Sequence, residues 1–377
     1  MENQNNLNRR DFITRAVTAT AAVSTAAISA AAETAPQHDS SRPLRIGCLN
    51  VSSYSHLPTL WGPLITARKG KQDTPFTNMN ITHCWEIDRS KAEEFAAQYG
   101  CEVVDDFDGM LGKVDGIISG GYYNHPWNHI IHEPYLEAGL PNLINRPFAN
   151  SLAKAKKLLD MAKRNGAAIL CPSGMELNDA IYRASAWAQN KNVICYNATN
   201  SFDDYPTHGV HGVYMICKAI AEAGFPVVSV AYQTRNWYSH PGILTFEHED
   251  KNGRRFFGTL HQVSGSWATV SIHTPEEYGG KDFDVHTGTD YPFNKTEIWA
   301  PTVWAFQKMA MFGEMPQTLD DIYHKTNAFL AGWYSVLEKD GQPVKLAEVP
   351  EEWESPVELP SQPQDETVAL FRAKFGA

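Results

Sequence analysis

The chain has 377 residues, of which 43% are hydrophobic and 20% are charged, a composition typical of a globular protein large enough for two domains. Its formal net charge of -11 argues against a general affinity for nucleic acid or for anionic membranes. Beyond the first forty residues, no apolar run is long and pure enough to predict a transmembrane helix or a membrane anchor.

Residues 1–40 have the pattern of an export signal and linker. The pair Arg9-Arg10 is followed by a Phe, by a weakly apolar Ala/Thr/Val run over residues 16–32, and by small residues that predict cleavage within 30–35. The alternative is a disordered Ala-rich leader with a chance pair of arginines. The order of these features favours export by the twin-arginine machinery, and therefore a periplasmic or otherwise exported protein.

Residues 41–172 predict a Rossmann-like domain. Short apolar runs alternate with helical periodicity, and Ser151 and Gly166 are suited to begin and end one of the helices. This alternation predicts a doubly wound parallel sheet in an α/β fold. The predicted strands are residues 45–49, 81–86, 116–118, 142–144 and 168–171, and the predicted helices are 89–99, 129–138 and 152–165.

Residues 173–348 predict an α+β domain with a mostly antiparallel, open sheet, because strand patterns separated by turn signals predominate. The predicted strands are residues 193–197, 227–234, 242–247, 255–261 and 268–273, with helices at 213–223 and 302–312. Residues 349–377 are acidic and Pro-rich, and they predict an extended arm rather than packed structure.

The six cysteines form no C-x-x-C pair, and most lie in apolar, strand-like runs. Buried thiols are therefore favoured over disulfides or metal ligands. The cysteines are Cys48, Cys84, Cys101, Cys171, Cys195 and Cys217.

The loop after the first strand has the frame of a dinucleotide-binding turn without its glycines. Where G-x-G-x-x-G would stand, the chain has Asn50, Ser52 and Ser55. A side chain at Ser52 stands where backbone meets the pyrophosphate, although serine hydroxyls and a helix N-terminus still bind phosphate. Asp88 follows the second strand and either binds the ribose or caps the next helix; on this residue alone the cap is favoured.

The segment that follows resembles the glucose-fructose oxidoreductase, inositol dehydrogenase and MocA family (Gfo/Idh/MocA). Asn124 and His129 stand in a P-N-x-x-H-like turn, and Glu137-Ala138-Gly139 ends the helix as in A-G-K-H. Asn145-Arg146-Pro147 stands where the family has E-K-P. The order and spacing of these altered motifs continue over most of residues 44–345.

The resemblance implies a site in the cleft between a Rossmann domain and an α+β domain whose open sheet mediates homo-oligomerisation. It also implies catalysis by the lysine of E-K-P and by a D-x-x-x-H pair. Here Arg146 replaces that lysine, Thr207 stands in the place of the acid, and His211 is retained. The implied catalytic residues are Arg146, His211, His208 and Asp204, and the implied NAD(P)-binding residues are Asn50, Ser52, Ser55, Asp88, Asn124, His129 and Asn145.

The chemistry of Arg146 and His211 allows two interpretations. A guanidinium does not lose its proton, but it holds an anionic or hydroxyl-rich ligand and stabilises negative charge. An imidazole titrates near neutral pH and serves as a general acid or base. The structural alternatives are an ion pair for Arg146 and a hydrogen-bonded histidine at a helix start for His211.

Two further groups of residues bear on the ligand. A divalent metal bound by the histidines with Asp203, Asp204 or Glu176 stays open as a minority alternative, because neither H-E-x-x-H nor a comparable spacing supports it. Aromatic residues near the expected cleft favour a sugar, because their faces stack on sugar rings. The histidines are His56, His125, His129, His132, His208 and His211, and the aromatic residues are Tyr54, Tyr122, Tyr123, Trp127, Tyr205, Trp237 and Tyr238.

Three functions remain open from the sequence. The first is a family oxidoreductase that acts on a small carbohydrate or polyol with an NAD(P) carried tightly from the cytoplasm, since little free cofactor exists outside it. The second is a non-redox lyase or hydrolase that uses Arg146 and His211 without exchangeable NAD(P). The third is an exported carbohydrate-binding protein without catalysis. The resemblance favours the oxidoreductase label.

Overall fold

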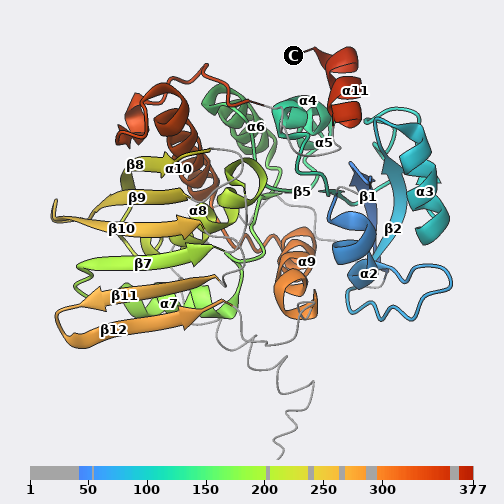
Figure 1. Ribbon diagram of the computed structural model, residues 1–377. Helices are drawn as coiled ribbons and strands as arrows, with labels where there is room; N and C mark the ends of the chain where they lie inside the picture. The colour runs from blue at the N-terminus through green and yellow to red at the C-terminus, as the bar shows by residue number, and fades with distance from the viewer. Residues whose placement is uncertain are drawn as a thin grey trace, which may run out of the picture. The chain divides into compact units, whose positions relative to one another are not determined.

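The computed structural model describes residues 42–52, 55–200, 204–236, 242–262, 268–285, 295–356 and 365–376. The chain separates into two units, residues 1–36 and 37–377, and all the structure below belongs to the second (Figure 1). The predicted export signal lies outside the described residues.

The first sheet confirms the Rossmann-like fold. Its strands are parallel and lie in the order β3-β2-β1-β4-β5-β6, so the order reverses between β1 and β4. The strands are β1 Leu44–Leu49, β2 Met79–Trp85, β3 Glu102–Val103, β4 Gly116–Ser119, β5 Asn142–Ile144 and β6 Ile169–Leu170.

The helices of this domain follow the predicted periodicity with one break. Asp88 caps α3 (Arg89–Tyr99) and Ser151 caps α6 (Leu152–Asn165), each accepting a backbone N–H in the first turn. The helix predicted over residues 129–138 is divided into α4 (Asn128–Ile131) and α5 (Glu133–Glu137). Pro134 lacks the N–H that a continuous helix would use, which accounts for the break.

The second sheet confirms the mostly antiparallel α+β domain. Its order is β12-β11-β7-β10-β9-β8-β13, and only β7 and β10 pair in parallel among the described strands. The strands are β7 Cys195–Asn200, β8 Val227–Thr234, β9 Gly242–Glu249, β10 Arg255–Gln262, β11 Thr269–Thr274, β12 Glu277–Asp284 and β13 Val344–Lys345.

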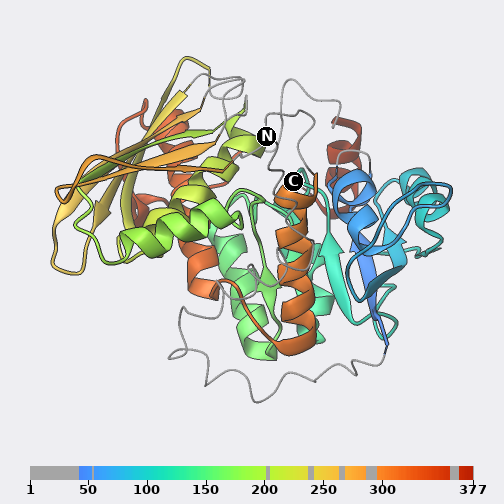
Figure 2. The ribbon, with the colours of Figure 1, turned by 90° about the horizontal axis from the view of Figure 1, so that it is seen from below.

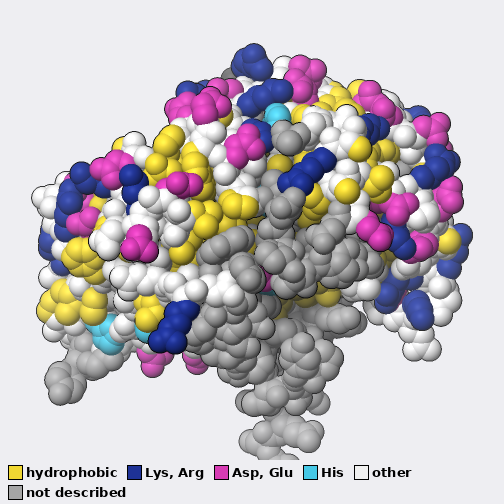
Figure 3. All heavy atoms as spheres, turned by 45° about the horizontal axis from the view of Figure 1, so that its top comes forward, with side chains coloured by type: hydrophobic (Ala, Val, Ile, Leu, Met, Phe, Trp, Pro, Cys, Tyr) yellow, Lys and Arg dark blue, Asp and Glu magenta, His cyan; other side chains and the backbone are white. Residues whose placement is uncertain are grey.

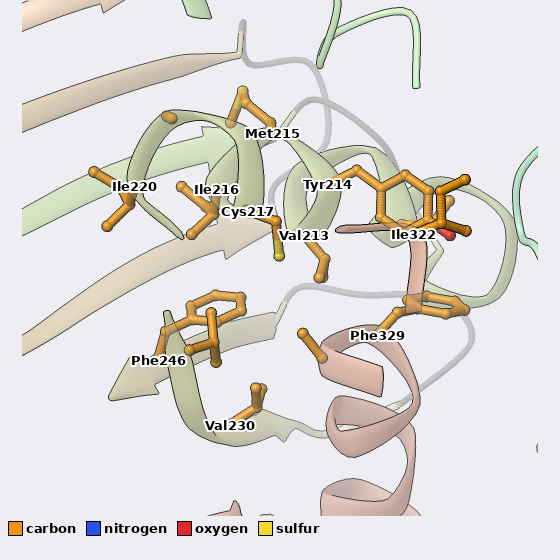
Figure 4. Close-up of a cluster of buried hydrophobic side chains, with 14 of the residues drawn as sticks. Val213, Tyr214, Met215, Ile216, Cys217, Ile220, Val230, Phe246, Ile322 and Phe329 are labelled. Atoms are coloured by element: carbon orange, nitrogen blue, oxygen red, sulfur yellow. The ribbon is translucent and has the colours of Figure 1, made fainter. Parts of the chain in front are cut away.

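Helices α7 (Asp179–Ala188), α8 (Val210–Ile216) and α10 (Leu319–Glu338) pack on one face of this sheet (Figure 1). Figure 4 shows the core between them, where Val213 and Ile216 of α8 approach Phe246 of β9 and Phe329 of α10. The strands alternate between buried and more exposed residues, as expected for a sheet covered on one face.

The last two helices, α10 and α11 (Asp365–Phe375), are not among the elements that the sequence predicts. Thr318 and Asp321 form a capping box that begins α10, and this T-x-x-D pattern was readable in the sequence. The prediction of an extended C-terminal arm is wrong for its end, because α11 packs against the Rossmann domain through Val368 and Phe371.

Helix α9 (Lys295–Phe312) also returns to the first domain, although its residues fall within the range predicted for the second (Figure 2). Its Val303, Phe306 and Met309 share a core with Ile46 and Ile81 of the Rossmann sheet. The two sheets are therefore joined by packed helices as well as by the chain.

The cysteines and the surface agree with the composition. All six thiols are free, and Cys48, Cys84, Cys171 and Cys217 are buried, whereas Cys101 and Cys195 are half-buried. On the face shown in Figure 3, acidic and basic side chains are interspersed, so this face has no continuous basic patch for a polyanion. Among the described residues, no helix combines the length and apolarity needed to cross a bilayer.

Candidate active site

The candidate site lies at the carboxyl edge of the Rossmann sheet, where open parallel sheets bind ligands. Tyr122 follows β4, Arg146 follows β5 and Ser173 follows β6, so neighbouring strands deliver these side chains to one edge. The second domain contributes His211 from α8 and His208 from the π-helical turn before it.

Arg146 and His211, paired by the resemblance, are in direct contact. Arg146 donates from Nε and Nη2 to Nε2 of His211, at 3.0 and 2.9 Å. Because a guanidinium only donates, His211 accepts at Nε2 and carries its proton on Nδ1, which donates to Ser173 Oγ at 2.6 Å. The chain thus fixes the tautomer of His211 from both sides of the ring.

The charge states of this pair follow from burial. Burial lowers the pKa of Arg146 to about 10, which still leaves the guanidinium charged at neutral pH. Burial first, and then the charge of Arg146, hold the pKa of His211 well below its usual value. His211 is therefore neutral with its lone pair bound to Arg146, which makes it a positioning partner of Arg146 in this arrangement rather than a general base.

A buried ion pair supports the site from behind. The backbone N–H of Ser173 donates to Oε2 of Glu176 at 3.0 Å, and Lys325 Nζ of α10 donates to both oxygens of that carboxylate at 2.7 and 2.9 Å. Both charged side chains are 2% exposed. The sequence suggests Glu176 only as a metal ligand, and it does not predict Ser173 or Lys325, because no local motif marks them.

His208 forms a dyad with Asp204. Its Nδ1 lies 2.5 Å from Asp204 Oδ2, and Thr207 Oγ1 donates to the other carboxylate oxygen at 2.7 Å. Burial raises the pKa of Asp204, but the hydrogen bonds from His208 and Thr207 outweigh it and the pKa is lowered overall. The Asp204 carboxylate therefore orients the imidazole of His208. The His208 side chain is 27% exposed, so the ring also reaches solvent.

Aromatic rings lie beside Arg146 and His56. Tyr122 lies under the guanidinium of Arg146, with 5.1 Å between Cζ and the ring centroid, and the ring of His56 lies 4.6 Å from that of Trp299. Of the predicted aromatic cluster, Tyr205 belongs instead to the core and Tyr123 and Trp127 contact α11. Tyr54, Trp237 and Tyr238 fall outside the described residues, as does Asp203.

The polar groups of the loop that replaces G-x-G-x-x-G are largely bonded within the protein. Asn50 adopts a positive φ of 56° and donates from Nδ2 to Ser119 Oγ at 2.9 Å. Ser52 Oγ lies 2.7 Å from Tyr123 OH, and Ser55 Oγ accepts from the N–H of Leu57 at 3.3 Å. The side chains thus bind the loop to its neighbours.

Glu86, which directly follows β2, accepts a hydrogen bond from the backbone N–H of Ser52 in this loop. Its Oε2 accepts from Ser52 N at 2.9 Å and from Tyr123 OH at 3.1 Å. Burial raises the pKa of this carboxyl to about 7. The sequence pattern places Glu86 only in a strand. Asp88, the candidate for the ribose, accepts from Ser90 N at 2.9 Å as the cap of α3.

Helix α11 covers the same edge on the β2 side. The ring of Phe371 stacks on Trp127 at 5.1 Å between centroids and meets Trp85 at 6.1 Å. Trp127 Nε1 donates to the carbonyl of Gly376 at 2.8 Å. With Glu86 on the loop N–H and Phe371 over the ends of β2 and β4, these residues do not fit a dinucleotide in the usual Rossmann orientation.

The remaining predicted cofactor residues also have neighbours within the first domain. Asn124 donates to Asn128 Oδ1 at 2.6 Å, and Asn145 donates to the carbonyl of Gly120 at 2.7 Å. Burial, and then Lys154 of α6, lower the pKa of His129 to about 4, which places its environment against α6. Among the described residues, no group of three or more His, Cys, Asp or Glu side chains is arranged to hold a metal ion.

Comparisons with known proteins agree with the architecture. Residues 63–171 match the model of a family described as "Oxidoreductase family, NAD-binding Rossmann fold", a match that begins after the altered loop. No curated protein matches the chain.

Solved structures share the fold over both domains at low sequence identity. A probable dehydrogenase from Thermotoga maritima has a TM-score of 0.63 at 13% identity, covering 81% of this chain and 100% of its own. Myo-inositol dehydrogenase from Lactobacillus casei, in complex with NAD(H) and myo-inositol, has a TM-score of 0.63 at 12% identity, covering 80% and 96%. GenD2 from gentamicin A biosynthesis, in complex with NAD, has a TM-score of 0.62 at 15% identity, covering 83% and 99%.

Proposed function

We propose that the chain is an enzyme of the Gfo/Idh/MocA type, whose family model matches residues 63–171, and that it acts on a sugar or sugar derivative at the Arg146–His211 site. We further propose that it does so without an exchangeable NAD(P). The observation that carries this second part is the hydrogen bond from Ser52 N to Glu86. A pyrophosphate would need that N–H, and an ionised Glu86 would repel it.

The chemistry available without a dinucleotide is proton transfer. Asp204 orients His208, and the ring centroid of His208 lies 6.1 Å from that of His211, whose Nε2 binds Arg146. An imidazole in this place exchanges a proton with a ligand carbon or oxygen. Arg146 stabilises negative charge that develops on a ligand oxygen. This combination suits a non-redox lyase or hydrolase.

A second candidate is sugar oxidation or reduction with a tightly retained NAD(P). The family match over residues 63–171 favours it, since that family is defined by an NAD-binding Rossmann fold. This candidate requires one of two things. Either NAD(P) binds without breaking the hydrogen bond between Ser52 N and Glu86, or NAD(P) is present during folding and takes the place of Glu86 at that N–H.

We expect His208→Ala and Asp204→Asn each to lower turnover of a sugar substrate by about 10²–10⁴-fold, the usual contribution of a general acid or base. The measurement is turnover on a panel of sugar derivatives, with mass spectrometry of the denatured protein to detect any carried dinucleotide. His261→Ala on β10, outside the site, is the matched control. Stoichiometric NAD(P) in the protein, cycling between its redox forms during turnover, would overturn the non-redox proposal in favour of the second candidate.

We also propose export by the twin-arginine route, on the pattern of residues 1–40. Replacing Arg9 and Arg10 together by Lys is expected to retain the full-length precursor in the cytoplasm, whereas Arg15→Lys in the same segment leaves export intact. Cell fractionation with N-terminal sequencing of the processed protein makes the test. Normal delivery of the double variant, with cleavage within 30–35, would exclude this route.

A further inference from the structure

The guanidinium of Arg146 is a buried charge that lacks a carboxylate partner among the described residues. Its side chain is 2% exposed, its bonds go to the neutral ring of His211, and Nη1 is buried without a hydrogen-bond acceptor in the described part of the chain. The nearby carboxylates are engaged elsewhere, Asp204 by His208 and Glu176 by Lys325. An isolated buried cation is costly unless an anion compensates it.

Lys325 is a second buried cation in the same region, and it differs from Arg146 in its partner. It is equally buried, and it has a carboxylate, Glu176, at 2.7 Å. Among the described residues, Lys325 therefore has a carboxylate in direct contact, whereas Arg146 has none. The positive charge of Arg146 also acts on His56. Burial first, and then this charge, hold the pKa of His56 well below its usual value.

The geometry of Arg146 is suited to a planar anion. Nε and one N–H of Nη2 bind His211, which leaves the edge formed by Nη1 and Nη2 with donors for a bidentate contact. Tyr122, whose ring lies 5.1 Å from Cζ, is itself only half-buried. The fixed positive charge of Arg146, bonded to the neutral ring of His211, balances one negative charge, whereas a phosphate monoester carries about two.

We propose that the ligand of this site is a carboxylated sugar derivative, a sugar acid whose carboxylate binds the Nη1–Nη2 edge of Arg146. This inference rests on the proposed function, since it names the class of sugar that the site accepts. The hydroxyl groups of such a ligand face the aromatic border formed by Tyr122 and His56, and its carboxylate replaces the missing counter-ion.

Calorimetric titration of the full mature chain with D-gluconate, D-glucose and D-glucose 6-phosphate tests the proposal. We expect gluconate to bind at least about tenfold more tightly than glucose, a factor typical of one charge-assisted bidentate contact. Arg146→Gln removes this preference, whereas Arg146→Lys keeps part of it because the charge remains. Arg183→Gln, at an exposed arginine of α7, is the matched control and leaves binding unchanged.

Each other outcome has a definite meaning. Equal affinity for glucose and gluconate, preference for glucose 6-phosphate, or gluconate binding that survives Arg146→Gln overturns the anion site. Circular dichroism and the Arg146→Lys variant separate loss of binding from loss of folding. If neutral sugars are turned over in a way that depends on His208, the proposed function holds and the sugar-acid inference fails. If gluconate binding depends on Arg146 but no turnover depends on His208, the sugar-acid inference holds and the proposed function fails.

Discussion

Cofactor-free protein is expected to give no measurable heat when titrated with NAD(H) or NADP(H) at millimolar concentration. The physical reason is that, in the described part of the loop and its surroundings, the groups that a dinucleotide would contact already have partners. Glu86 occupies the N–H of Ser52, Ser52 Oγ is bonded to Tyr123, and Phe371 stacks on Trp127 over the ends of β2 and β4. Binding therefore requires breaking internal contacts before any new contact is made.

The double variant Glu86→Ala/Phe371→Ala is expected to gain dinucleotide binding, because it frees the loop N–H and loosens α11. Loss of a buried Phe costs about 3–5 kcal/mol, and at a terminal helix this cost releases the helix rather than unfolding the domain. Glu93→Ala/Leu370→Ala changes exposed residues of α3 and α11 and should behave as wild type. Micromolar affinity of the wild type would show that the serine loop is itself a working phosphate cradle.

Replacing Lys325 by Met is expected to lower the free energy of unfolding by about 3–5 kcal/mol, because it leaves the Glu176 carboxylate buried without a counter-ion. Both side chains are 2% exposed and in contact at 2.7 Å, and Lys325 also lies 4.4 Å from the ring centroid of Tyr214. Urea denaturation of the variant and the wild type gives the difference.

Two comparisons make that result specific to the ion pair. Lys325→Met/Glu176→Leu is expected to recover most of the lost stability, since the uncompensated charge is gone. It should still weaken ligand binding, because Glu176 accepts the N–H of Ser173 and Ser173 positions His211. Lys91→Met, at an exposed pair with Glu94, should cost less than about 1 kcal/mol. If Lys325→Met also cost less than about 1 kcal/mol of unfolding free energy, the buried ion pair would not stabilise the fold as proposed.

The sequence by itself determined the two domains, because the periodicity of apolar residues encodes strands and helices locally. It also marked Arg146 and His211 as members of one site, since each stands in a recognisable place of the family's spaced motifs, and it marked the serine loop as an altered dinucleotide turn. The cap at Asp88 was likewise readable, because a cap depends only on residues of its own turn.

Only the tertiary structure decided what those residues do to one another. Arg146 and His211 are 65 residues apart, Glu176 and Lys325 are 149 apart, and Trp127 meets Gly376 over a separation of 249. Such contacts leave no local pattern, because they form when packed elements bring distant segments together and not when any one segment folds. For this reason the bound lone pair of His211, the reach of Glu86 into the loop and the cover of α11 over the sheet edge could not be predicted from the sequence.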